Sequence, residues 1–81
     1  MIDKKLYIQL KKEVRCLCRK NLLKMCEDME LNNFEKDLLL DFYDNKTVVE
    51  ICMKHNINKN SYIRYLKNIF NKVYDYKNTQ F

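Results

Sequence analysis

Glycine, proline and tryptophan are absent from this 81-residue chain, and histidine occurs once. Strand-rich folds rely on glycine and proline for their turns, whereas helix interiors tolerate neither residue. Their absence favours an all-helical fold whose turns are made by Asn, Asp and Lys. The chain also lacks a glycine-rich phosphate loop and paired carboxylates in an evident pocket, so we do not expect an enzyme and name no catalytic residue.

Long apolar runs are missing as well. No stretch approaches the roughly 20 apolar residues that span a bilayer, and the first residues lack the uninterrupted apolar core of a secretion signal. We therefore expect a cytoplasmic protein without a membrane partner. The basic, amphipathic N-terminal segment is the one alternative, because such a helix can lie on a membrane surface. Its apolar face is needed to cover the other helices, which favours the cytoplasmic interpretation.

The residues that are present indicate an ordered, basic domain. Hydrophobic residues make up 47% of the chain and aromatic residues 12%, more than a disordered chain carries, and the length suits one domain over residues 1–81. The net charge of +5 and the pI of about 9.0 favour a polyanionic partner, such as nucleic acid. Charge alone is equally typical of lysine-rich proteins that bind no polyanion.

Four cysteines raise the question of a disulfide or a metal site. In a reducing cytosol Cys16, Cys18, Cys26 and Cys52 would stay thiols, and we expect them to be small residues that fill the core. Together with His55 they have the chemistry of zinc ligands. However, Cys16 and Cys18 point to different faces of a helix, so no metal and no cofactor is expected. His55 is then expected to be partly buried and hydrogen-bonded.

Residues 3–30 have one long helical pattern, with Asp3 as its N-cap. Asn21 is the weak point, where a break into two helices is the alternative. An unbroken helix would be about 42 Å long at 1.5 Å per residue, longer than a small bundle can cover. We therefore expect this helix to be a scaffold that also forms a homodimer. Its apolar stripe includes Leu6, Leu10, Val14, Leu17 and Met25.

The rest of the chain contains the signals of three shorter helices. Asn32 and Glu35 form a capping box that opens a helix over residues 33–43, and Thr47 and Glu50 form another that opens the next helix. Asn56 is expected to end that helix, and a further helix should continue to Val73. The tail, residues 74–81, loses the periodicity and should fray.

Residues 45–66 have the pattern of two short helices joined by a tight turn. A helix-turn-helix needs a small residue at the helix crossing, a residue that tolerates positive φ, an apolar residue and a polar cap. These requirements are met by Cys52, Asn56, Ile57 and Asn58. Tyr62 and Leu66 can face back onto the first helix, which leaves the opposite face of the second helix for DNA.

The candidate DNA-binding residues lie on and before this second helix. Arg64 suits bidentate hydrogen bonding to guanine, Asn60 suits an adenine edge, and Lys59 and Lys67 suit phosphates. The alternative interpretation is that this face of the helix contacts only solvent. The full candidate set is Lys46, Thr47, Asn58, Lys59, Asn60, Ser61, Ile63, Arg64 and Lys67.

Residues 31–73 resemble region 4 of bacterial sigma factors and the related LuxR-type helix-turn-helix domains. The residues that carry this resemblance are Leu31, Glu35, Leu38, Leu39, Leu40, Phe42 and Tyr43, then Lys46 to Ile51, then Asn56 to Asn58 and Ser61 to Lys67. The chain departs from the family pattern at three positions. Family members usually have glycine at the position of Asn56, alanine at that of Cys52, and valine or isoleucine at that of Tyr62.

The resemblance implies a stand-alone transcriptional regulator that binds double-stranded DNA in a sequence-directed way. The domain that would bind the core polymerase in a complete sigma factor is missing from this chain, as in regulators of the phage or mobile-element kind. RNA polymerase is an implied partner. The alternative is a sigma-like protein-interaction module that docks on RNA polymerase or another regulator without binding DNA, with Tyr62, Tyr65 and Phe70 as its anchors.

Overall fold

The computed structural model describes residues 3–80, with side chains as far as Asn78. Within residues 3–80 the chain forms five helices and no strand. They are α1 (Lys4–Cys16), α2 (Arg19–Asp28), α3 (Asn33–Tyr43), α4 (Val48–His55) and α5 (Lys59–Gln80). The predicted all-α bundle is confirmed.

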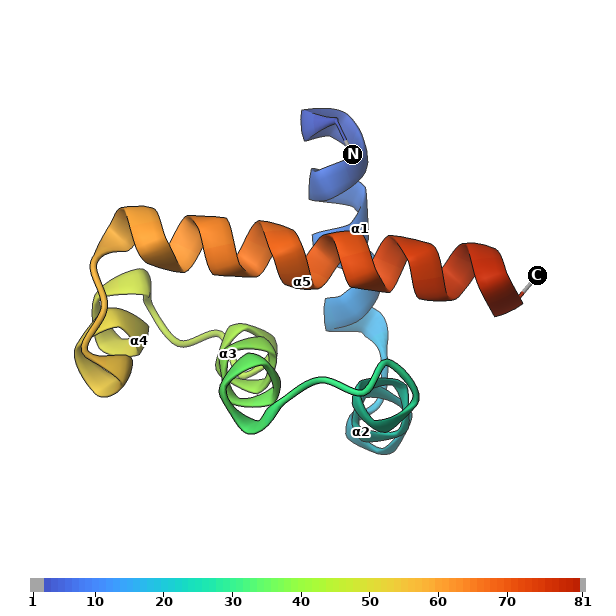
Figure 1. Cartoon of the computed structure of the whole chain (residues 1–81), viewed down its shortest axis with the longest axis horizontal. Coiled ribbons are helices and arrows are strands. Elements are labelled where there is room, and N and C mark those ends of the chain that lie inside the picture. Colours follow the sequence, from blue (N-terminus) through green and yellow to red (C-terminus); the bar gives the residue numbers. More distant parts are fainter. Residues whose placement is uncertain (1–2, 81) are drawn as a thin grey trace.

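The longest helix, α5, lies along the long axis of the molecule (Figure 1). α2, α3 and α4 lie in a row on one side of α5, whereas α1 crosses α5 so that its first half extends past it on the other side (Figure 1). All five helices contribute to one core. Its buried apolar residues are Leu10, Val14, Leu22, Met25, Cys26, Leu38, Leu39, Phe42, Ile51, Tyr62, Leu66, Ile69, Phe70 and Val73.

The predicted N-caps are confirmed at four helices. The side chain of each cap accepts a hydrogen bond from the backbone amide three residues later, at 2.7 Å for Asp3, 2.8 Å for Asn32, 3.1 Å for Thr47 and 2.8 Å for Asn58. Asn32 and Thr47 form complete capping boxes. Each such cap contributes about 1 kcal/mol and sets where its helix begins.

The single N-terminal helix expected over residues 3–30 is wrong. α1 ends at Cys16 and α2 begins at Arg19, because Leu17 and Cys18 have extended backbones. The Tyr43 hydroxyl donates a 2.5 Å hydrogen bond to the Leu17 carbonyl, which an unbroken helix would offer to the amide of Asn21. The break therefore lies before Asn21, and a contact from α3 holds it.

The fraying tail expected from residue 74 onward is also wrong as far as Gln80, since α5 continues to that residue. The Tyr76 hydroxyl donates to a carboxylate oxygen of Asp28 at 3.0 Å, and Lys77 pairs with Glu13 at 2.6 Å. These contacts hold the last turns of α5 against α2 and α1. Phe81, the end of the expected tail, lies outside the described residues.

The turns use positive φ without glycine. Glu30, Asn45 and Asn56 have φ values of 56°, 62° and 54°. Asn56 lies in the left-handed helical region and forms the C-cap of α4, as expected from the sequence. Its position determines the direction in which the chain leaves α4 toward α5.

Replacing Asn56 by alanine should lower the free energy of unfolding by about 1 kcal/mol, because a left-handed backbone brings Cβ too close to the next carbonyl oxygen. Glycine has no Cβ, so Asn56→Gly should unfold at the same or a slightly higher urea concentration than the parent protein. Urea unfolding followed by circular dichroism measures both variants. Equal losses for the two would mean that the asparagine side chain, rather than the positive φ, stabilises this turn.

Candidate functional site

The structure brings α4 and the start of α5 together through a short turn. The amide of Ile57 donates to the carbonyl of Cys52 at 3.0 Å, which closes the end of α4. Tyr62 and Leu66 of α5 are buried in the core, as the sequence predicted. The turn and the buried face are therefore confirmed, while the use of this unit as a DNA-binding motif stays a prediction.

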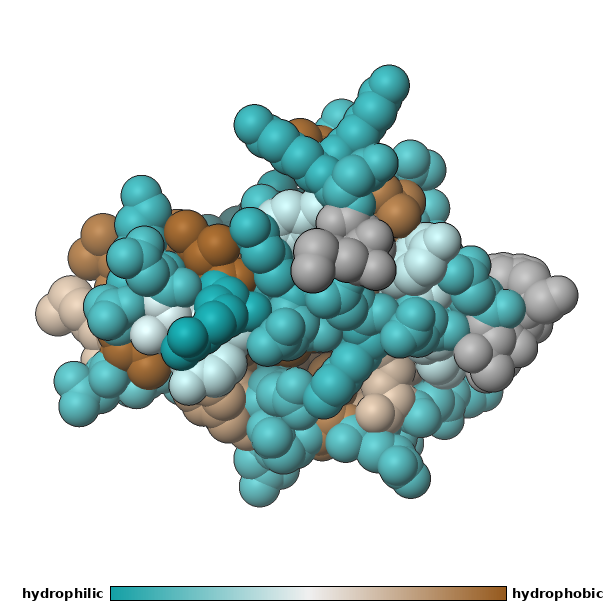
Figure 2. All heavy atoms as spheres, turned by 45° about the horizontal axis from the view of Figure 1, so that its top comes forward, coloured by the Kyte–Doolittle hydropathy of each residue, from teal (hydrophilic) through white to brown (hydrophobic). Residues whose placement is uncertain are grey.

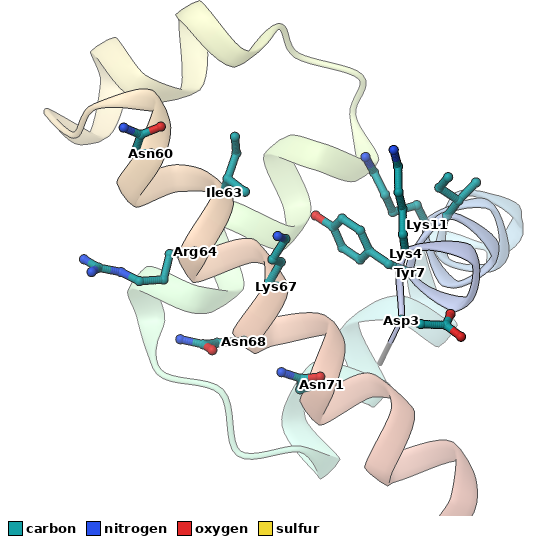
Figure 3. A pocket seen from close by; sticks show the side chains of 11 residues that line it. Asp3, Lys4, Tyr7, Lys11, Asn60, Ile63, Arg64, Lys67, Asn68 and Asn71 are labelled. Carbon is teal, nitrogen blue, oxygen red and sulfur yellow. The ribbon is translucent and has the colours of Figure 1, made fainter. Parts of the chain in front are cut away.

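A groove of about 760 Å³ lies between the first half of α1 and the first half of α5 (Figure 3). Tyr7 reaches from α1 toward the α5 side that carries Ile63 and Lys67, whereas Arg64 and Asn68 point to the side of α5 away from α1 (Figure 3). The groove thus has one wall from each helix. It is lined by Asp3, Lys4, Tyr7, Ile8, Lys11, Asn60, Ile63, Arg64, Lys67, Asn68 and Asn71.

The groove is cationic. Its lining includes Lys4, Lys11, Arg64 and Lys67 but only one carboxylate, Asp3, which already accepts from the amide of Leu6 to cap α1. Among the side chains that the structure describes, none of these four cations forms an ion pair. Their positive charge is therefore available to an anionic ligand.

The floor of the groove is partly apolar and is fixed by the core. Tyr7 meets the ring of Phe70 edge-on, with centroids 5.4 Å apart, and the amine of Lys11 lies 5.1 Å from the Tyr7 ring centroid. Burial, with a smaller contribution from Tyr62, raises the pKa of Tyr7 to about 12. The Tyr7 phenol is therefore protonated at neutral pH and can donate a hydrogen bond.

Four of the nine predicted site residues line this groove: Asn60, Ile63, Arg64 and Lys67. Lys59 is exposed at the start of α5 but does not line the groove. Thr47 and Asn58 use their side-chain oxygens as helix caps, and the amide of Ser61 is the donor to Asn58. The predicted set is thus divided between a groove wall and the framework of the turn.

Lys46 has a structural partner that the sequence analysis did not foresee. Its amine lies 3.2 Å from a carboxylate oxygen of Asp41, a residue that is only 3% exposed. Lys54 and His55 contact the same carboxylate at 3.1 Å each. The charge of Lys46 is therefore paired within the chain, where it ties the turn between α3 and α4 to α3.

Burial of Asp41 by itself raises the pKa of its carboxyl. Hydrogen bonds from His55, Lys54 and Lys46 outweigh that effect and hold the pKa below its usual range. The carboxylate is therefore ionised at neutral pH. The expectation that His55 is partly buried and hydrogen-bonded is confirmed, because its Nε2 lies 3.1 Å from Asp41 and its ring packs edge-on against Phe34.

The anchors proposed for a protein-interaction module are not available in the expected way. Tyr62 and Phe70 are buried in the core, and Tyr65 packs edge-on against Phe34 at 5.1 Å. Exposed apolar side chains occur instead on α4, where Val49 is 68% and Met53 is 78% exposed. Brown surface is visible at the end of the molecule that carries α4 and the start of α5 (left in Figure 2).

The cysteines do not all fill the core. Cys26 is buried and Cys52 is half-buried, but Cys16 and Cys18 are exposed, so the expectation was wrong for these two. They are exposed because they lie at the break between α1 and α2, where the apolar stripe of the expected helix is interrupted. No group of three or more His, Cys, Asp or Glu side chains within the described residues is placed to hold a metal ion.

Sequence reasoning missed the α1 wall of the groove and the far end of the α5 wall. Lys4, Tyr7 and Lys11 recur at helical spacing along α1, and Asn60, Arg64, Lys67 and Asn71 do so along α5. This spacing was readable as one polar stripe on each helix. That the two stripes face one groove depends on how α1 crosses α5, which the sequence pattern does not contain.

Two further observations concern the whole described chain. None of the helices found within residues 3–80 combines the length and apolar character needed to cross a membrane. Comparison of the chain with protein-family models, curated proteins and solved structures gives no match. The resemblance of residues 31–73 to sigma region 4 therefore stays a prediction, and function must be argued from the groove and its charges.

Proposed function

We propose that this protein binds double-stranded DNA in a sequence-directed way and acts as a transcriptional regulator. In this proposal the first half of α5 enters the major groove as a recognition helix. One observation carries it: Asn60, Arg64 and Lys67 share one exposed face of α5, and neither cation on that face has a carboxylate partner among the described residues.

Each residue has a role that follows from its chemistry. Arg64 would bind guanine through two parallel hydrogen bonds, and Asn60 would bind an adenine edge. Lys59 and Lys67 would contact phosphates. The first turn of α5 contains no acidic residue, so its helix dipole favours a phosphate there. The start of α4 is less suitable, because the Glu50 carboxylate already occupies its capping box.

A pool of duplexes with a randomised core, selected by the purified protein, tests the proposal. We expect the selection to enrich one motif. Arg64→Ala should lose the preference at one position of that motif, equivalent to about 1–3 kcal/mol of discrimination, because the bidentate contact is gone. Lys59→Ala should weaken binding to all sequences alike and lower the salt slope by about 0.9. Gel shifts at low and high salt measure both effects.

Two control variants sharpen this test. Arg64→Lys keeps the charge but cannot form the planar fork, so it should keep the salt slope of the parent and still lose the base preference. Lys24 is exposed on α2, away from the groove, and Lys24→Ala should bind like the parent. Binding that neither Arg64→Ala nor Lys59→Ala changes would contradict the proposal.

One recognition helix rarely supplies enough affinity by itself, so the proposal includes a second contribution, from a homodimer or from RNA polymerase. The homodimer was expected because an unbroken helix over residues 3–30 would be too long for the bundle to cover, and the structure has two shorter helices there. α1 has only 13 residues, and its Leu10 and Val14 are buried within the same chain. Ile8 is the exposed large apolar residue that α1 still offers to a partner. A cytoplasmic location belongs to the same proposal.

A protein-interaction module that docks on RNA polymerase or another regulator is the second candidate. It is favoured by Val49 and Met53, which lie one turn apart on α4 and are exposed. The two candidates differ in their dependence on salt. Binding through phosphates weakens steeply as salt is raised, whereas failure to retard any duplex at low salt would favour the interaction module.

A further inference from the structure

We infer that the groove between α1 and α5 holds one sugar–phosphate strand of the bound duplex, with Lys4 and Lys11 of α1 in contact with its phosphates. This inference rests on the proposed function and extends it to a helix outside the helix-turn-helix. It assigns α1 a direct role in binding DNA. From the sequence, the N-terminal segment was expected to serve as scaffold or dimer contact, with a membrane surface as the alternative.

The charge of the groove points to this ligand. Lys4 and Lys11 lie seven residues apart and therefore on the same face of α1, opposite Lys67 of α5. None of the three has an ion-pair partner among the described side chains. Cations on both walls match the phosphates of a strand, which carry one negative charge per nucleotide.

The floor of the groove suits the rest of the strand. Tyr7, Ile8 and Ile63 present apolar surface, which fits the carbon face of deoxyribose. The protonated phenol of Tyr7 adds a hydrogen-bond donor for a phosphate oxygen. An acidic peptide would also match the cations. The carboxamides of Asn60 and Asn71 in the lining can donate to phosphate oxygens, and failure to bind any duplex would favour the peptide.

The arrangement of the helices fits the shape of a duplex. A helix in the major groove of DNA is bordered on each side by a phosphate strand. The major groove is only about 12 Å wide, so both strands lie close to the helix. The first half of α1 extends past α5 on the side opposite α2, α3 and α4 (Figure 1). A duplex read by α5 would therefore place one bordering strand between α5 and α1.

The test compares two double variants of α1. K4A/K11A removes the two cations that α1 contributes to the groove, whereas K5A/K12A removes the same charge at the same spacing from a face that does not line the groove. Losing two phosphate contacts should lower the log–log salt slope by about 1.8. The parent should accordingly lose about tenfold more affinity than K4A/K11A between about 50 and about 200 mM salt. K5A/K12A should keep nearly the slope of the parent.

Because the Lys11 amine lies over the rings of Tyr7 and Phe42, K4R/K11R serves as a second variant that keeps the charge and these contacts. It should restore the slope of the parent. If the parent binds DNA and both alanine double variants have the same slope, the α1 contact is refuted while the proposed function stands. If the parent retards no duplex at low salt, both are refuted.

Discussion

Replacing Phe70 by alanine is expected to lower the free energy of unfolding by about 4 kcal/mol. Phe70 is fully buried near the middle of α5, and truncating a buried phenylalanine costs about 3–5 kcal/mol through lost burial and the cavity left behind. Its ring also meets Tyr7 of α1 and Phe42 of α3 edge-on, at 5.4 and 5.5 Å between centroids. A chain of this size has a total stability of only about 4–12 kcal/mol.

Thermal and urea unfolding of the purified variants measures this effect. Phe70→Leu keeps most of the volume and should stay folded, with a loss of about 1–2 kcal/mol. It should also loosen the contact that holds Tyr7 in the groove floor, so α1 would be positioned less firmly beside α5. Val49→Ala is the matched control, because Val49 is exposed, and should change stability by less than about 0.5 kcal/mol. A Phe70→Ala protein as stable as the parent would contradict the described core.

Replacing Asp41 by asparagine should cost about 2 kcal/mol at neutral pH. The change removes a buried carboxylate that three cationic or basic side chains share, and removing one partner of a buried pair commonly costs 3–5 kcal/mol. The smaller figure is appropriate here because Lys46 and Lys54 are half-exposed and can turn toward water. Asp37→Asn, an exposed change on the same helix, is the control and should be nearly neutral.

The stabilisation by Asp41 should also depend on pH in a defined direction. Its pKa is lower in the folded chain than the ordinary value of 3.8, so the folded state favours the ionised form. The contribution is then complete above about pH 5 and is lost as the pH falls through the folded pKa, below about 4. The difference in unfolding free energy between the parent and Asp41→Asn should shrink as the pH is lowered from about 7 to about 3. A difference that stays constant over this range would mean that charge is not what Asp41 contributes.

The local part of this fold was readable from the sequence because short-range contacts specify it. Asn32 and Thr47 open helices through hydrogen bonds to amides three residues away, and Asn56 tolerates a positive φ that a residue with a bulkier side chain would avoid. The alternation of buried and exposed residues in α5 follows from a period of 3.6. The all-α fold, the turn between α4 and α5 and the exposure of Arg64 were therefore predictable.

Contacts between distant segments decided the rest. Leu17 and Cys18 are compatible with a helix, yet a hydrogen bond from Tyr43 on α3 accompanies the break there. The last turns of α5 have little periodicity of their own, but Tyr76 and Lys77 are held by α2 and α1. Asp41 has the sequence character of a surface residue on α3 and became a buried partner for three residues that follow it.

The candidate site shows the same division. The sequence by itself determined that α5 carries Asn60, Arg64 and Lys67 on one face, because helical spacing places them there without help from other elements. Only the tertiary structure decided that this face is one wall of a groove whose other wall carries Lys4, Tyr7 and Lys11. That result depends on the break after α1 and on the packing of Tyr7 against Phe70, and such contacts leave no periodic signal in the chain.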